Sequence, residues 1–184
     1  MSTSRPVKSI CLCVTGGVAA YKAAHLASRL TQAGIDVHVA ITPAGLSFIG
    51  SATFQALTGN PVMQSVFHGE SAPYGGHIQL ANSTDIMAVV PATADFLAKA
   101  VQGNADCIAS ATYLAFRGPV YVAPAMNAAM WNHPATQRNL TQLQQDGVQI
   151  LEPDEGWLSC RQHGTGRLKD IDEILELLIH AATS

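Results

Sequence analysis

Short apolar runs that alternate with helical patterns constrain this chain more than any other feature of its sequence. Four such runs are followed within two residues by Gly or Pro, at 9–15, 36–41, 85–90 and 119–123. Continuous apolar runs of this length are typical of parallel strands that are buried on both faces. Helical spacing of apolar residues lies between them, over 18–33, 93–101, 105–115 and 134–145. We therefore predict an α/β fold, a single domain (1–184) built on a doubly wound, Rossmann- or flavodoxin-like parallel sheet with helices on both faces.

The remaining segments are shorter or less regular. Residues 44–57 predict short helical turns, and 58–76, which is rich in Gly, Pro and Ser, predicts a long loop or lid. Residues 148–151 are a last candidate strand, and 170–182 place apolar residues on one helical face. The polar, Gly-containing segment 160–167 predicts a flexible loop.

The composition bounds the kind of partner that the chain can bind. Only 12% of the residues are charged, against about 25% in an average soluble domain. So few charges favour a homo-oligomer that covers part of the surface, although an ordinary Ala-rich domain is the alternative. The net charge of −3 argues against a nucleic-acid surface. No apolar stretch reaches the roughly 18 residues of a membrane span, and no signal-peptide cleavage site is visible, so we expect a cytoplasmic protein without membrane contact.

The four cysteines divide into two kinds. Cys11 and Cys13 lie on one face of a predicted strand, where we interpret them as small core residues. No Cys or His set has the spacing of a zinc site, so no metal is expected. Cys160 differs because it lies in a polar loop, where a buried hydrophobic residue has no reason to be.

The carboxyl ends of the strands are the expected ligand site, as in other doubly wound sheets. These ends are Thr15-Gly16-Gly17, Thr42-Pro43, Pro91-Ala92-Thr93 and Pro124-Ala125-Met126-Asn127. Gly16 and Gly17 allow a tight turn that presents N–H groups and a helix N-terminus to a phosphate, although a plain strand-to-helix turn also uses glycine. The pattern is not a Walker loop, because Lys22 lies more than one turn into the helix.

Each remaining candidate also has an ordinary explanation. Thr93 fits a helix N-cap as well as a ligand contact. The Met and Trp residues of 126–131 are more typical of a core, but Asn127 places an amide directly at a strand exit. His77 follows two glycines, where a solitary histidine is usually an ordinary surface or core residue. Residues 160–167 can form a lid over a charged ligand or a plain surface loop.

Taken together, these segments resemble the homo-oligomeric flavin-containing cysteine decarboxylases, over about residues 10–167. The resemblance rests on Gly-Gly-Val-Ala-Ala-Tyr-Lys at 16–22, His-Ile-Gln-Leu at 77–80 and Pro-Ala-Thr-Ala-Asp at 91–95. The most diagnostic family signature, Pro-x-Met-Asn-x-x-Met-Trp, stands complete at 124–131. Its continuation at 132–139 and the Cys-x-x-x-Gly-x-Gly-Arg loop at 160–167 are similar to the bacterial phosphopantothenoylcysteine decarboxylase branch.

The resemblance implies FMN bound between the subunits of a trimer, with a dodecamer of trimers as a larger assembly. The implied FMN contacts are Thr15, Gly16, Gly17, Val18, Thr42, Pro91, Ala92, Thr93, Asp95 and Ser110. The implied contacts to a phosphorylated small-molecule substrate are Met126, Asn127, Arg161, Gly164, Gly166 and Arg167, most of them in a substrate-clamp loop at about 154–168. Two positions depart from the usual family residues, namely Gly17, where many members have Ser, and Cys107, where an acid or amide is common.

The implied reaction is FMN-dependent decarboxylation of 4′-phosphopantothenoylcysteine to 4′-phosphopantetheine in coenzyme A biosynthesis. Oxidation of the thiol carbon to a thioaldehyde lets the sulfur accept the electrons that the departing CO₂ leaves behind, and re-reduction completes the sequence. The resemblance assigns catalysis to His77 as proton acceptor, Asn127 as carboxylate ligand and Cys160 as proton donor.

Alternative functions within and outside this family remain open. One is a peptidyl-cysteine decarboxylase that makes an enethiol on a peptide, which would not need Cys160 or the clamp. Another is a non-enzymatic relative that regulates a phosphatase, although such proteins lose a catalytic residue and gain acidic extensions. The resemblance also implies fusion to, or association with, phosphopantothenate–cysteine ligase.

Overall fold

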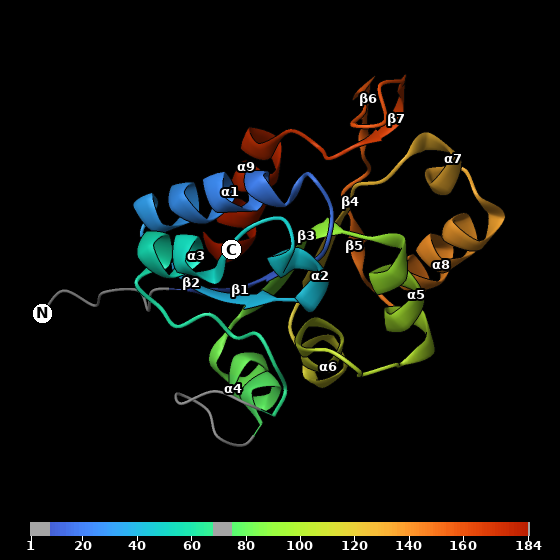
Figure 1. Cartoon of the computed structure of the whole chain (residues 1–184). Coiled ribbons are helices and arrows are strands. Elements are labelled where there is room, and N and C mark those ends of the chain that lie inside the picture. Colours follow the sequence, from blue (N-terminus) through green and yellow to red (C-terminus); the bar gives the residue numbers. More distant parts are fainter. Residues whose placement is uncertain (1–7, 68–74, 184) are drawn as a thin grey trace, which may run out of the picture.

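A five-stranded parallel sheet forms the centre of the molecule (Figure 1). The structure is a computed structural model that describes residues 8–67 and 75–183. The sheet strands are β1 (Ser9–Val14), β2 (Asp36–Ile41), β3 (Ile86–Ala92), β4 (Val120–Pro124) and β5 (Gln149–Ile150). Their order is β2-β1-β3-β4-β5, the flavodoxin-like order whose direction reverses between β1 and β3. The predicted doubly wound fold is therefore confirmed.

Helices cover both faces of this sheet (Figure 1). Their bounds are α1 (Ala20–Gln32), α2 (Pro43–Leu46), α3 (Ser51–Thr58), α4 (Gly76–Ser83), α5 (Ala94–Gln102), α6 (Ile108–Ala115), α7 (Ala128–Trp131), α8 (Pro134–Gln145) and α9 (Ile171–Thr183). Most of the predicted helices are present within a few residues of their expected bounds. The sequence prediction missed α4 and α7, and residues 68–74 of the predicted 58–76 loop lie outside the described residues.

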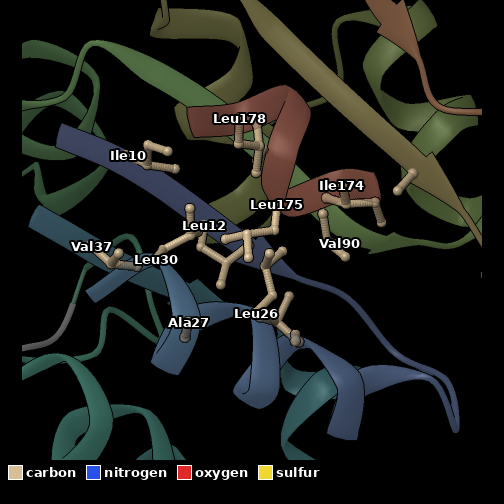
Figure 2. Packing of buried hydrophobic residues seen from close by; sticks show 14 of the residues in the cluster. Ile10, Leu12, Leu26, Ala27, Leu30, Val37, Val90, Ile174, Leu175 and Leu178 are labelled. Atoms are coloured by element: carbon tan, nitrogen blue, oxygen red, sulfur yellow. The ribbon is translucent and has the colours of Figure 1, made fainter. Parts of the chain in front are cut away.

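Alternation along β1 divides the buried residues into two cores. Ile10 and Leu12 face α1 and α9, and Figure 2 shows them packed against Leu26, Leu30 and Leu178. Cys11 and Cys13 face the opposite side and belong to the core under α5, α6 and α8. Their sulfur atoms are 3.7 Å apart and fully buried, which confirms their interpretation as core residues. The hydrogen bond with the Cys11 thiol, followed by burial, raises the pKa of Cys13 well above its usual value, so this sulfur stays protonated.

Residues 154–167 form a β-hairpin, so 160–167 are not the flexible loop that the sequence predicted. Its strands, β6 (Asp154–Trp157) and β7 (His163–Arg167), pair antiparallel in a sheet of their own. Arg167 lies 3.7 Å from the Asp154 carboxylate across the hairpin, and His163 lies 3.4 Å from Glu155. The segment is polar and short because these strands pair with each other and not with the central sheet. No helix in the described ranges combines the length and apolar composition that a membrane crossing needs.

Candidate functional site

The hydroxyl of Thr15 joins the carboxyl ends of β1 and β3, at the point where the strand order reverses. It donates a hydrogen bond to the Pro91 carbonyl at 2.7 Å and accepts one from the Thr93 amide at 3.1 Å. Thr15 is 1% exposed, so these bonds are shielded from water. This residue therefore fixes the two strand ends relative to each other, where the topology predicts a ligand.

The turn that follows β1 presents unused backbone donors. Gly17 has φ +135°, a conformation that favours glycine, and a Cβ at this position would meet open space. Among the residues that the structure describes, the N–H groups of 16–19 have no hydrogen-bond partner. The first turn of α1 also contains no acidic residue. Free donors at the positive end of a 13-residue helix form a suitable site for an anion such as a phosphate.

A cavity of about 270 Å³, here named the threonine cavity, lies beside this turn. Its lining includes Thr15, Gly16, Thr42, Thr93, Asp95, Lys99, Asp106 and Cys107. The hydroxyl of Thr42 caps α2 by accepting from Gly45 N, and that of Thr93 caps α5 by accepting from Phe96 N. Thr93 therefore has the N-cap role that the sequence suggested, and it also lines the threonine cavity.

An ion-pair cluster closes one side of the threonine cavity. The Lys99 ammonium lies 3.0 Å from a carboxylate oxygen of Asp95 and 3.0 Å from one of Asp106. These two hydrogen bonds raise the pKa of Lys99, so its charge is held between the two acids.

A second cavity of about 410 Å³, here named the clamp cavity, lies between the sheet and the β6–β7 hairpin. The hairpin docks on the exit of β4, where the Met126 amide donates to the Gly166 carbonyl at 2.9 Å. A Cβ on Gly166, which has φ +135°, would collide with the Met126 carbonyl oxygen. Only glycine therefore permits this close approach between hairpin and strand.

Asn127 and Cys160 meet at the clamp cavity although 33 positions separate them in the sequence. The Asn127 side chain donates from Nδ2 to Cys160 Sγ at 3.1 Å. Its Oδ1 accepts from the Ala129 amide at 2.7 Å and caps α7. The amide is thus held in one orientation, with its donor group beside the thiol. An amide donor and a thiol at this spacing can bind a small anionic group and give it a proton.

The tip of the hairpin is a tight turn that carries Cys160. Leu158 N donates to the Gln162 carbonyl at 2.8 Å, and Arg161 N donates to the Leu158 carbonyl at 2.9 Å. Arg161 has φ 63°, an unusual conformation for a residue with a side chain. Its guanidinium does not line the clamp cavity, whereas Cys160 does.

His77 lies apart from Asn127 and Cys160 within one copy of the chain. It belongs to α4, which Figure 1 shows at the opposite end of the molecule from the hairpin. His77 lines neither cavity, and its buried Nδ1 has no hydrogen-bond partner among residues 8–67 and 75–183. Within one copy, α4 packs against α6 and not against the strand exits, so His77 does not join Asn127 and Cys160 there.

Some of the other predicted site residues line a cavity and some do not. Those at the clamp cavity are Gly17, Val18, Pro91, Met126, Asn127, Cys160, Gly166 and Arg167. Ala92, Ser110, Arg161 and Gly164 line neither cavity. Ser110 is 1% exposed, and its hydroxyl accepts from the Cys107 amide at 3.3 Å at the start of α6. Gly164 instead lets the hairpin approach Ala128.

Several residues that the sequence interpretation did not assign to the site also line the clamp cavity. Among them are Tyr21 and Lys22 from α1 and Trp157 from β6. Tyr21 and Trp157 are 61% and 66% exposed, which is unusual for such large rings. The only available signal for Lys22 was its place just beyond the glycine turn, on the helix that begins at a strand exit. The expectation that Lys22 lies more than one turn into this helix is wrong, because α1 begins at Ala20 and Lys22 lies in its first turn.

Comparison with known proteins decides the family. A model of the Flavoprotein family matches residues 1–183. The chain belongs to the Flavoprotein family. It is 42% identical, over 170 residues and 92% of its length, to the coenzyme A biosynthesis bifunctional protein CoaBC of Bacillus subtilis. The chain spans 42% of the length of that relative.

Solved structures of similar flavoproteins have the same fold. A PPC decarboxylase variant complexed with pantothenoylaminoethenethiol superposes with a TM-score of 0.85 at 25% identity, over 96% of this chain and 99% of that one. The FMN-dependent cysteine decarboxylase SpaF superposes with a TM-score of 0.83 at 32% identity, over 96% and 98% of the two chains. The family resemblance expected from the sequence motifs is therefore confirmed.

Proposed function

We propose that this flavoprotein binds FMN and decarboxylates 4′-phosphopantothenoylcysteine to 4′-phosphopantetheine in coenzyme A biosynthesis, in the cytoplasm. The observation that carries the proposal is the Asn127–Cys160 contact of 3.1 Å, which joins the exit of β4 to the tip of the docked hairpin. Two relatives support it, since one is a coenzyme A biosynthesis protein and the other is a PPC decarboxylase with a bound enethiol.

The residues at the strand ends fit the cofactor. The free N–H groups of 16–19 suit the phosphate of FMN, and Thr15, Thr42 and Thr93 line the adjoining threonine cavity. When bound, FMN would accept the electrons of the thiol carbon and return them after CO₂ has left. The open space at Gly17 leaves the backbone accessible to this ligand.

Asn127 and Cys160 have separate roles in the proposed reaction. The Asn127 amide, oriented by its bond to Ala129, donates to the substrate carboxylate. Cys160 lies beside that amide and would supply the proton that, together with the hydride that the reduced cofactor would return, converts the enethiol to the saturated thiol. The solvent-exposed hairpin tip allows this thiol to regain its proton between turnovers.

We assign the proton acceptor to His77 of a second copy. Within one copy α4 lies at the opposite end of the molecule from the hairpin, so the His77 imidazole would have to reach the substrate from a neighbouring copy, where it can accept a proton. A trimer, with a dodecamer of trimers as a larger assembly, would bring α4 of one copy to the strand ends of the next. The bifunctional relatives further suggest fusion or association with a phosphopantothenate–cysteine ligase.

The product of the reaction tests the proposed function. Purified protein loaded with FMN is incubated with 4′-phosphopantothenoylcysteine, and with a peptide that ends in cysteine as the competing substrate. We expect the mass of 4′-phosphopantetheine from the first and no change in the second. Loss of CO₂ only from the peptide would establish the peptidyl-cysteine alternative, and no loss from either would contradict a decarboxylase.

Mixed assemblies test the shared site. The variants His77→Asn and Asn127→Asp are each expected to be inactive alone. If the two residues act across a subunit boundary, dissociated and reassembled mixtures contain some sites with both native residues and recover part of the activity. Mixtures that stay inactive, although sedimentation shows mixed trimers, would contradict the assignment of His77 to a second copy.

A further inference from the structure

The clamp cavity has an excess of positive charge that the proposed roles of Asn127 and Cys160 do not explain. Its lining contains Lys22 and Arg167 and neither Asp nor Glu. The whole chain, in contrast, carries a net charge of −3. The threonine cavity contains two acids around Lys99, and a third hollow, of about 620 Å³, near the carboxyl ends of α5, α6 and α8, contains both Arg117 and Asp146. The clamp cavity is thus the one of these three that favours an anion.

Lys22 is the cation of this cavity that lacks a carboxylate. Arg167 already lies 3.7 Å from Asp154, and Lys169 lies 2.9 Å from Glu173 outside the cavity. No described carboxylate pairs with Lys22, which is half-buried in the first turn of α1. A cation at the positive end of a helix is unfavourable unless an anion joins it. The position of Lys22 therefore indicates an anionic ligand in the clamp cavity, next to the turn at 16–19 that we assign to the phosphate of FMN.

We propose that Lys22, assisted by Arg167, binds the phosphate monoester of the substrate and so selects the phosphorylated form. The inference rests on the proposed function, because it names the group of that substrate, the phosphate, that the clamp cavity would bind. Asn127 and Lys22 line the same cavity, so one extended ligand can place its carboxylate at the first and its phosphate at the second. A lysine suits this role, since its ammonium acts as a point charge toward a tetrahedral dianion.

The phosphate of FMN has the same chemistry, so the experiment has one arm for each source. The variants are Lys22→Gln, which removes the charge, and Lys22→Arg, which keeps it. Arg138→Gln is the matched control, because Arg138 is exposed on α8, lines none of the three hollows and also removes one positive charge. In the substrate arm, calorimetric titration of the FMN-loaded proteins with 4′-phosphopantothenate and with pantothenate measures the preference for the phosphorylated compound without any turnover. In the cofactor arm, the binding of FMN is compared with the binding of riboflavin.

The wild type and Arg138→Gln should bind 4′-phosphopantothenate roughly 10- to 100-fold more tightly than pantothenate, the range for hydrogen bonds to a charged group. Lys22→Gln should lose most of this preference, and Lys22→Arg should keep most of it. An unchanged preference in Lys22→Gln would overturn the proposal. If the preference is unchanged and Lys22→Gln binds FMN more weakly but riboflavin equally well, then Lys22 contacts the phosphate of the cofactor. This result would also overturn the proposal. A preference that persists in a wild type that releases no CO₂ would reject the reaction but not the phosphate site.

Discussion

Gly166 is the position where a single methyl group should separate the hairpin from the sheet. Its φ of +135° lies in the region that side chains rarely adopt. An added Cβ would also collide with the Met126 carbonyl oxygen. The Met126 amide donates to the Gly166 carbonyl at 2.9 Å, and this hydrogen bond would break if the strand moved away. We therefore expect Gly166→Ala to undock the clamp and leave the central sheet intact.

The magnitude follows from two contributions. Backbone strain at such a position costs about 1–3 kcal/mol, and the lost hydrogen bond costs about 0.5–1.5 kcal/mol. The docked state should therefore lose roughly 2–4 kcal/mol relative to the undocked one, which is a change of about 30- to 1,000-fold in the equilibrium. The free energy of global unfolding should fall by less than this, because β6 and β7 form a sheet of their own.

Hydrogen exchange of the Met126 amide measures this effect directly. Its protection should fall in Gly166→Ala, together with turnover, while the amides of β1 and β3 stay protected. Gly156→Ala is the matched control, because a Cβ there would meet only the movable Arg167 side chain, at 3.0 Å from Nε. If both variants kept Met126 protected and turned over equally, the docking contact at Gly166 would not hold the clamp.

Two further predictions concern residues outside the hairpin. His77→Asn should lower the rate of flavin reduction by substrate by roughly 10²- to 10⁴-fold. The variant should change the free energy of unfolding by less than about 1 kcal/mol, since the His77 Nδ1 has no partner among the described residues. If stopped-flow absorbance showed a near-normal rate of flavin reduction, the role of His77 would be structural. Partial burial would raise the pKa of Asp36, but hydrogen bonds from Asn60 and His38 outweigh it and lower this pKa. The stabilisation by Asp36 is present above its unfolded pKa of about 3.9 and is lost as the pH falls through the lower folded value. Asp36→Asn should flatten this acid limb in denaturant titrations, and an unchanged limb would refute the argument.

The sheet and the edge that carries the site were predictable from the sequence. β1, β3 and β4 are apolar runs with Gly or Pro at or near their carboxyl ends, and β2 is followed by Thr42-Pro43, so the positions of these four strands and their carboxyl ends follow from local pattern. Because parallel strands place those ends at one edge, Thr15 and Asn127 were expected near the ligand, and both line a cavity there. Local sequence decides these features, and the structure agrees with them.

The hairpin and the place of His77 depend on contacts that local pattern does not encode. β6 and β7 have little apolar alternation, because they pair with each other and dock through Gly166 on Met126. Helix α4 has only eight residues and begins after Gly75 in a left-handed conformation, so no clear period reveals it. The Ser110 hydroxyl, which the resemblance places at the cofactor, accepts a hydrogen bond from the Cys107 amide at the start of α6. Such alternatives between a local and a ligand contact are decided by packing.

The most direct test of the proposed chemistry is mass spectrometry of a single turnover by the Cys160→Ser variant. A hydroxyl is nearly isosteric with the thiol but is a far weaker acid, so it cannot supply the proton of the second half-reaction. Loss of CO₂ should continue, and the variant should accumulate the enethiol, lighter than the normal product by H₂, while wild type gives the saturated thiol. Saturated product from Cys160→Ser at the wild-type yield would contradict the account and leave Cys160 as a residue of the hairpin turn.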